Sequence, residues 1–290
     1  MIGLFCAAAV IASPAQNTFF VSLLSFLGAD GIAPSALVQA NDGNFYGTTL
    51  YGGAFTNNCS PYGCGTVFKI TPAGTVTTLY SFCPQPNCLD GAKPRAALVQ
   101  ATEGSFYGTT EAGGGSNYCN PPGCGTVFRI TPGGALITLH RFEGTDGDYP
   151  NASLVQATDG NFYGTTLTTV FKITPSGTLT TLVTQLYYPS ALIQASDGNF
   201  YGTTPLGGAN CSPSGCGTVF KVTPTGELTT LYSFCSQPNC TDGWHPNAGL
   251  VQGSDGNLYG TTFGGGTNDD CNGYEYCGTV FKITLSPLYS

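Results

Sequence analysis

Charged side chains are scarce in this chain. Asp, Glu, Lys and Arg make up 8% of its 290 residues, against about 25% in typical globular proteins. The net charge is -8, with only eight basic residues, so the chain lacks the positive surface that a phosphate backbone requires. No apolar run reaches the roughly 18 residues that a membrane-spanning helix needs. These absences argue against a nucleic-acid-binding protein and against a helical membrane span.

Zinc-binding patterns are also missing. No C-x-x-C occurs, and the two histidines, His140 and His245, stand alone, whereas structural zinc sites combine such ligands at short spacings. Cysteine itself is abundant, with 13 copies, and twelve of them fall into six local pairs. The pairs are Cys59/Cys64, Cys83/Cys88, Cys119/Cys124, Cys211/Cys216, Cys235/Cys240 and Cys271/Cys277. This arrangement predicts six local disulfides and an oxidising, extracellular location.

The N-terminus has the composition of an export signal. Ile2–Ala12 is an apolar segment, and Ser13–Ala15 supplies small residues at a cleavage site. The odd cysteine, Cys6, lies inside this segment. A buried first strand is the alternative interpretation. We therefore divide the chain into a signal-peptide-like segment, 1–15, and a single domain, 16–290.

Four short phrases alternate along the chain and define a repeat. The phrase DGNFYGTT at Asp42–Thr49 recurs in five copies, and the others are LVQA, TVFKIT and TTLYSF. Each phrase is rich in β-branched and aromatic residues, which predicts a strand. Asp-Gly and Pro-x-Gly steps between the phrases predict tight turns. Each repeat is therefore expected to form a four-stranded antiparallel meander, which is typical of a β-propeller blade.

The number of phrases predicts a closed ring. The first three phrases occur five times, whereas the fourth occurs four times after its own repeat, and Phe20–Phe26 supplies the remaining copy. We therefore expect an all-β, five-bladed β-propeller in which Phe20–Phe26 pairs with Thr279–Thr284 to complete the last blade. An open solenoid is the alternative. The third repeat is shortened and has no cysteine loop.

The joint pattern DGNFYGTT…GG…C…CGTVFKITP.G covers nearly the whole chain after residue 15. It resembles the GloVer tandem-repeat family, the choice-of-anchor proteins of bacterial surfaces. The resemblance implies export and a repeat-built β structure, and it supplies no catalytic motif. The chain ends at ITLSPLYS without an anchor or sorting segment, and we therefore expect release or assembly rather than attachment to the cell wall.

Several polar residues recur in every repeat, and each set has a structural and a functional interpretation. The glutamines are Gln39, Gln100, Gln156, Gln194 and Gln252, and the basic residues are Lys69, Arg129, Lys172, Lys221 and Lys282. A ligand would normally break such fivefold symmetry. We therefore expect the glutamines to connect neighbouring blades, and the basic residues to form ion pairs or cation–π contacts rather than an anion-binding ring.

Known catalytic patterns do not occur. There is no Gly-x-Ser-x-Gly motif, no phosphate-binding loop and no histidine beside a nucleophile motif. Propeller glycosidases need carboxylates in the channel, but the LVQA phrase has none, and most acidic residues precede a turn glycine. The pairs Asp146/Asp148 and Asp269/Asp270 lack the spacing of known calcium loops. We expect no enzyme activity, no metal and no cofactor.

Aromatic residues near the channel mouth are the candidate ligand site. A proline precedes each LVQA phrase, and the residues before that proline differ between repeats. The candidates are Tyr149, Tyr187, Tyr188, Trp244 and His245. Aromatic rings beside Asn and Asp suit sugar recognition or stacking against another subunit, and plugging of the channel is the alternative.

We therefore predict a secreted or cell-surface bacterial protein that is not an enzyme and binds carbohydrate or another surface. The alternative is a structural subunit of an extracellular filament or matrix, and a glycan-active enzyme is the least favoured interpretation. The expected partners are glycans or copies of the chain itself.

Overall fold

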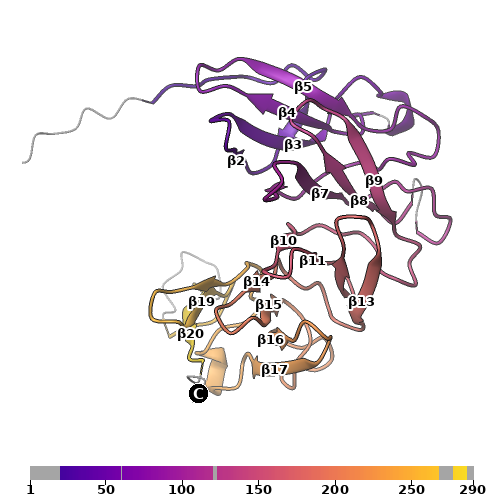
Figure 1. Ribbon diagram of the computed structural model, residues 1–290. Coiled ribbons are helices and arrows are strands. Elements are labelled where there is room, and N and C mark those ends of the chain that lie inside the picture. The colour runs from indigo at the N-terminus through magenta and orange to yellow at the C-terminus, as the bar shows by residue number, and fades with distance from the viewer. Residues whose placement is uncertain (1–19, 60, 120–122, 268–276, 286–290) are drawn as a thin grey trace, which may run out of the picture.

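The computed structural model of the chain describes residues 20–59, 61–119, 123–267 and 277–285. Within these ranges, twenty strands form five antiparallel sheets. Figure 1 shows the sheets following one another round an arc, from the first sheet at the top to the fifth at the lower left. The predicted all-β architecture of antiparallel repeats is thus confirmed. The signal-like segment 1–15 lies outside the described residues.

The second to fifth sheets take their strands in chain order, whereas in the first sheet β1 and β2 both pair with β3. The first contains β1 (Ile32–Pro34), β2 (Val38–Gln39), β3 (Phe45–Tyr51), β4 (Thr66–Ile70) and β5 (Val76–Ser81). The second contains β6 (Val99–Gln100), β7 (Phe106–Thr110), β8 (Thr126–Ile130) and β9 (Leu136–Arg141). The third contains β10 (Val155–Gln156), β11 (Phe162–Thr165), β12 (Val170–Ile173) and β13 (Leu179–Val183). The fourth contains β14 (Ile193–Gln194), β15 (Phe200–Thr204), β16 (Thr218–Val222) and β17 (Leu228–Ser233). The fifth contains β18 (Val251–Gln252), β19 (Leu258–Thr261) and β20 (Val280–Ile283).

Helical structure in the described ranges is limited to two 3-10 turns, η1 (Asn57–Cys59) and η2 (Pro238–Cys240). Across that same part of the chain, no helix has the length and apolarity to cross a membrane.

The acidic residue of the DGNFYGTT phrase builds the first hairpin turn of each repeat. The Asp159 carboxylate accepts hydrogen bonds from the Asn161 backbone N–H at 3.0 Å and from the Tyr163 hydroxyl at 3.0 Å. Gly160 adopts a φ of +78° between them, a conformation that favours glycine. The same backbone contact recurs at Asp42, Asp197 and Asp255. These carboxylates therefore have the turn-forming role that their position before glycine predicts.

The next three residues of the phrase, Gly164, Thr165 and Thr166, each make a close contact. Gly164 leaves room for the Phe171 ring, because a Cβ atom on Gly164 would lie 2.6 Å from that ring. The Thr165 hydroxyl donates to the Ser190 carbonyl of the next repeat at 3.2 Å. The Thr166 hydroxyl is buried against that of Thr169 at 2.9 Å.

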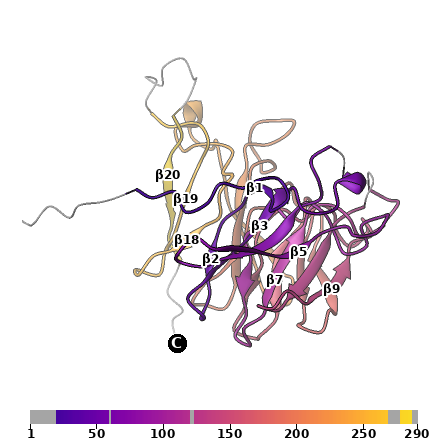
Figure 2. The same cartoon turned by 90° about the horizontal axis from the view of Figure 1, so that it is seen from above.

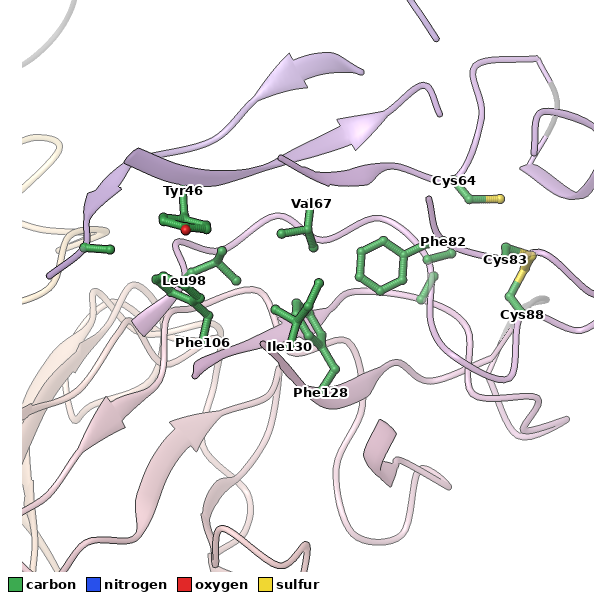
Figure 3. Close-up of a cluster of buried hydrophobic side chains, with 13 residues drawn as sticks. Tyr46, Cys64, Val67, Phe82, Cys83, Cys88, Leu98, Phe106, Phe128 and Ile130 are labelled. Carbon is green, nitrogen blue, oxygen red and sulfur yellow. A yellow bond between two sulfur atoms is a disulfide. The ribbon is translucent and has the colours of Figure 1, made fainter. Parts of the chain in front are cut away.

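Neighbouring sheets share one hydrophobic core at each interface, as Figure 3 shows for the first two repeats. Tyr46 stacks on Phe106 of the next repeat with ring centroids 4.1 Å apart, and Phe82 meets Phe128 edge-on at 5.3 Å. All four side chains are at most 1% exposed. Burial of a ring of this size stabilises the fold by about 1.5–3 kcal/mol, so each sheet depends on its neighbour.

Four of the five recurrent glutamines connect adjacent repeats, as predicted. The side-chain Oε1 of Gln100 accepts a hydrogen bond from the Asn41 backbone N–H at 3.1 Å. Equivalent bonds of 2.9–3.1 Å reach Gln156, Gln194 and Gln252 from the preceding repeats. Exposed side-chain amides thus satisfy backbone donors at the ends of the short strands.

Two of the five recurrent basic residues, Lys172 and Lys282, make the predicted ion pairs and cation–π contacts. Lys172 Nζ lies 2.9 Å from the Asp159 carboxylate and 5.5 Å from the Tyr163 ring centroid. Lys282 repeats this with Asp255 at 2.9 Å and Tyr259 at 5.6 Å. Both ion pairs are partly exposed, and such pairs contribute at most about 1 kcal/mol.

The predicted pairing of Phe20–Phe26 with Thr279–Thr284 is not found among the described residues. The fifth sheet stops at β20 with three strands, and residues 20–26 form no strand. The segment lies instead against the first sheet, where the rings of Phe26 and Phe68 are 5.0 Å apart. That contact repeats the Phe82–Phe128 contact of the next interface. Residues 20–26 thus pack on the first sheet as the fourth strand of a preceding repeat would. They form no hydrogen-bonded ladder with the fifth sheet.

The close approach at Gly164 generates a stability prediction. We expect Gly164→Ala to destabilise the fold by about 1–3 kcal/mol, because the added methyl group overpacks the Phe171 ring. Gly133→Ala is the matched control, since a Cβ there would have its nearest neighbour 3.8 Å away. Urea unfolding followed by far-ultraviolet circular dichroism would measure both, and equal midpoints for the two variants would contradict the prediction.

Candidate functional site

All five repeats contribute to one cavity of about 500 Å³. Its lining consists of Ala36, Arg95, Ala96, Ala97, Asn151, Ala152, Ser153, Ser190, Ala191, Asn247 and Gly249. We call this space the central cavity. In every repeat its lining residues lie between the recurrent proline and the first short strand of the sheet. Equivalent positions in the five repeats therefore converge there.

A left-handed residue stands before each of these prolines. The residues are Ala33, Lys93, Tyr149, Tyr188 and His245, with φ between 46° and 57°. This conformation costs an L-residue about 1–2 kcal/mol, and a following proline restricts the backbone further. No Gly or Asn marks these positions, so the sequence carried no signal for the strain.

Loop carbonyls hold these strained residues in place. The backbone N–H groups of Lys93, Tyr149 and His245 donate to the carbonyls of Cys64, Cys124 and Cys216 at 2.7–2.8 Å. Each acceptor belongs to a disulfide-bonded cysteine. In the shortened third repeat, the Leu167 carbonyl accepts from Tyr188 at 2.8 Å instead. The disulfide loops thus support the entrance of the central cavity.

The five disulfides in the described residues join the partners that the sequence predicts. They are Cys59–Cys64, Cys83–Cys88, Cys119–Cys124, Cys211–Cys216 and Cys235–Cys240. Cys277 is also disulfide-bonded, and its predicted partner, Cys271, lies outside the described residues. Figure 2 shows the long connections on the upper side of the sheets, with the coiled ribbons, and the short hairpins on the lower side. The cysteine loops belong to those long connections.

The lining of the central cavity is nearly neutral, and alanine and glycine make up more than half of it. Asn151, Asn247 and Ser153 offer hydrogen-bond donors and acceptors, whereas the Ser190 hydroxyl already accepts a hydrogen bond from the Thr203 hydroxyl at 2.9 Å. The only charged lining side chain in the described residues is Arg95, and its guanidinium lies 3.4 Å from the Glu111 carboxylate. Sequence reasoning missed these residues. They could have been found because they follow the recurrent prolines and differ from repeat to repeat.

The predicted aromatic residues do not form one patch. Trp244 lies against His245 and Phe263, with ring centroids 4.5 and 5.7 Å away. Tyr149 packs on the core between the second and third repeats. Burial lowers the pKa of His245 below its usual value, which favours the neutral imidazole near pH 7.

The two adjacent tyrosines lie at different places on the surface. Tyr188 is 50% exposed and stands two residues before Ser190 of the central cavity. Tyr187 is 57% exposed and borders a separate groove with Gly207, Gly208 and Pro213. The structure thus brings Trp244 and His245 together, and places Tyr149 and Tyr188 at equivalent positions of neighbouring repeats, but separates Tyr187.

The repeat pattern identifies the family of the chain. The model described as the Gloeobacter/Verrucomicrobia repeat matches residues 9–185 and 167–288. The chain belongs to this repeat family. No curated protein matches the chain by sequence.

Solved structures resemble this repeat-family member in fold. An inactive variant of virginiamycin B lyase from Staphylococcus aureus, determined with quinupristin, aligns with a TM-score of 0.55 at 17% identity, over 91% of this chain and 74% of the lyase. A streptogramin B lyase aligns with a TM-score of 0.53 at 18% identity, over 87% of this chain and 68% of the lyase.

A third solved structure is the extracellular domain of a one-component system from B. thetaiotaomicron. It aligns with a TM-score of 0.54 at 11% identity, over 86% of this chain and 27% of that one. At such identities the likenesses show a shared β-propeller-like fold and nothing of the activity.

The repeat carboxylates have lowered pKa values. Burial alone would raise the pKa of Asp159, but hydrogen bonds from Asn161, Lys172 and Tyr163 lower it to about 2. Hydrogen bonds from Asn257, Tyr259 and Lys282 also lower the pKa of Asp255. These groups stay ionised far into the acid range, so the turn network persists there.

The lowered pKa of Asp159 predicts how stability depends on pH. The pKa is about 2 in the folded chain and about 3.9 in an unfolded chain. This group stabilises the fold above the unfolded value, and the stabilisation is lost as pH falls toward the folded value. We expect the thermal midpoint to fall between roughly pH 4 and pH 2, and to fall less steeply in Asp159→Asn.

Calorimetry across that pH range would measure the slopes. Glu227→Gln is the control, because Glu227 is exposed in the turn before β17 and has no such network. An Asp159→Asn variant with the same acid slope as the Glu227→Gln variant would show that the carboxylate does not have this role.

Proposed function

We propose that this repeat-family protein is an extracellular, non-catalytic module that binds neutral carbohydrate in its central cavity. One observation carries the proposal: side chains that differ between repeats, among them Asn151 and Asn247, meet in one cavity, where the charged side chain of Arg95 is paired with Glu111. The cavity volume of about 500 Å³ lies in the range of small-molecule sites, about 300–1,000 Å³. Sugar hydroxyls are recognised by such neutral donors and acceptors.

An extracellular location is supported by three features. The described chain contains five disulfides, and disulfides persist in oxidising compartments. The chain belongs to a bacterial repeat family. The extracellular domain of a one-component system has a similar fold.

The non-catalytic part of the proposal concerns carboxylates. Glycoside hydrolysis requires two of them facing the scissile bond, and no Asp or Glu is among the described residues that line the central cavity. Glu111 reaches this region only through its ion pair with Arg95. The binding hypothesis therefore needs fewer assumptions than a hydrolytic one.

Paired substitutions in the central cavity test the binding site. Asn151→Ala with Asn247→Ala removes two exposed amides, and we expect binding of a neutral oligosaccharide to weaken about tenfold or more, since each hydrogen bond contributes about 1 kcal/mol. A glycan array of neutral and acidic oligosaccharides would supply the probe, and calorimetry would measure its affinity.

Asn41→Ala is the matched control, because Asn41 is exposed in a hairpin turn away from the central cavity. Unchanged affinity in the double variant would overturn the site assignment. Release of new reducing ends from the bound oligosaccharide would overturn the non-catalytic part of the proposal.

We also propose that the two ends of the arc join within one chain to complete a five-bladed ring. Leu37 on the first sheet is 53% exposed, and Val280 on the fifth is 80% exposed. Their counterparts at internal interfaces, such as Leu98 and Val67, are 4% and 0% exposed. The first and fifth sheets thus carry complementary halves of the interface that all other neighbours form.

Closure would supply the contacts that these halves lack. Tyr259 would stack on Phe45, as Tyr46 stacks on Phe106 at 4.1 Å. Gln39 would accept a hydrogen bond from the Ser254 backbone N–H, as Gln252 accepts from Ser196 at 2.9 Å. Residues 20–26, already seated on the first sheet, would then lie beside β20.

The Val280→Asp substitution tests closure. In a closed ring it places a charge in a buried interface, and we expect a loss of at least about 2 kcal/mol in the free energy of unfolding. Ile137→Asp is the control, because Ile137 is 50% exposed on β9. Urea unfolding of a chain shown to be monomeric by sedimentation would decide, and equal effects of the two substitutions would mean that the ring stays open.

A further inference from the structure

Two repeats each bring four cysteines together. The first cluster contains Cys59, Cys64, Cys83 and Cys88, and the second contains Cys211, Cys216, Cys235 and Cys240. Within each cluster all four Sγ atoms lie within 4.8 Å of one another. The spacing is C-x4-C-x18-C-x4-C in both. The pairing of neighbouring cysteines along the sequence does not reveal this grouping, because the two pairs of a cluster belong to different connections of the sheet.

The fold creates these clusters by placing two connections side by side. In the first repeat, Cys59 and Cys64 lie between β3 and β4, and Cys83 and Cys88 lie between β5 and β6. Figure 3 shows Cys64 beside the Cys83–Cys88 disulfide at the outer end of the core. Cys64, Cys83 and Cys88 are at most 1% exposed. Cys59 is partly buried, and in the second cluster Cys216 is buried while Cys211 is exposed. Four adjacent cysteine sulfur atoms are the donor set of a tetrahedral site with four thiolate ligands.

Contacts other than the disulfides hold the first cluster together. The Asn58 side-chain amide of one connection donates to the Cys83 carbonyl of the other at 2.9 Å. The Asp90 carboxylate accepts from the Cys83 backbone N–H at 3.0 Å. The Lys93 backbone N–H donates to the Cys64 carbonyl at 2.7 Å. None of these three bonds involves a sulfur atom, so none of them requires the disulfides to be formed.

The second cluster has an equivalent support. The Asn210 side-chain amide donates to the Phe234 carbonyl at 2.9 Å, and so connects its two loops as Asn58 does. The His245 backbone N–H donates to the Cys216 carbonyl at 2.8 Å. The arrangement is thus a property of the repeat rather than of one loop.

We propose that each cluster is a redox-dependent metal site that binds one Zn²⁺ when its four cysteines are reduced. Zinc binds thiolate sulfur at about 2.3 Å in tetrahedral geometry, which separates the sulfur atoms by about 3.8 Å. Sulfur atoms of different pairs already lie within 4.8 Å of one another. The two sulfur atoms of each disulfide, bonded at about 2 Å, must move apart by nearly 2 Å after reduction to reach that geometry. In the oxidised chain the same atoms form two disulfides and hold no metal.

The exchange balances with an external dithiol as the reductant. Two disulfides take up four electrons and four protons to give four thiols, and two molecules of the dithiol supply them, each being oxidised to its own disulfide. Zn²⁺ then displaces four protons from the thiols, because only thiolates ligate the ion. In the reverse direction, two molecules of a small-molecule disulfide take up the four electrons and are reduced to thiols, while the four thiolates form two disulfides and release the ion.

The second repeat supplies an internal control. Its disulfide, Cys119–Cys124, occupies the same connection as Cys59–Cys64. The following connection, between β9 and β10, contains no cysteine. This repeat therefore offers only two sulfur atoms, which is too few for a closed site with four thiolate ligands.

Metal counting on the full chain tests the proposal. The chain is reduced with dithiothreitol, incubated anaerobically with Zn²⁺, passed through a desalting column and analysed by mass spectrometry for zinc. We expect about two zinc ions per reduced chain and none per oxidised chain, from one four-thiolate site in each of two repeats. We expect Cys83→Ser and Cys235→Ser each to lose one ion, and Cys119→Ser to keep both.

A second measurement separates metal ligation from misfolding. Zn²⁺ should raise the thermal midpoint of the reduced chain, because a ligand that binds only the folded state stabilises it. Co²⁺ in place of Zn²⁺ should give the visible absorption of tetrahedral thiolate coordination. A reduced chain that binds no zinc, or a Cys119→Ser variant that loses as much zinc as Cys83→Ser, would overturn the proposal.

Discussion

Each sheet of this protein has two apolar faces, and only a neighbouring sheet can cover them. Tyr46 and Val67 face forward into the next repeat, and Leu98 and Phe128 of that repeat face back. No repeat can therefore bury its own core, and the stability of each depends on the next. The same phrase recurs in the sequence because every interface needs the same side chains in the same places.

The sequence predicted these elements because their signals are local. Asp-Gly turns, β-branched strands and paired cysteines depend on neighbours a few residues away, and they recur in the structure where expected. Fivefold recurrence also separated structural polar residues from ligand-binding ones, as the bond between Gln100 and Asn41 shows. The buried threonine pair of Thr166 and Thr169 was missed, although Thr recurs at both positions in every repeat.

What could not be predicted depends on contacts between distant segments. The left-handed conformation of Tyr188 results from a carbonyl in another loop, and nothing in its own residue type indicates it. The grouping of four cysteines needs two connections to meet, and spacing along the chain does not show this. Ring closure likewise depends on the curvature accumulated over four interfaces. Residues 20–26 pack on the first sheet, but they do not form the expected hydrogen-bonded ladder with β20.

Positions that differ between repeats are the ones at which such a scaffold can acquire specificity for a ligand. Positions that build the interface cannot change without opening a core, so they stay the same from repeat to repeat. The positions directly after the recurrent prolines are Ser35, Arg95, Asn151, Ser190 and Asn247 in the five repeats, and the last four line the central cavity. Their identities are free to differ because no neighbouring sheet packs on them. The strained residues before the prolines, held by loop carbonyls, fix where those side chains enter the cavity. A symmetric scaffold thereby presents an asymmetric lining, which is what selective binding of one ligand requires.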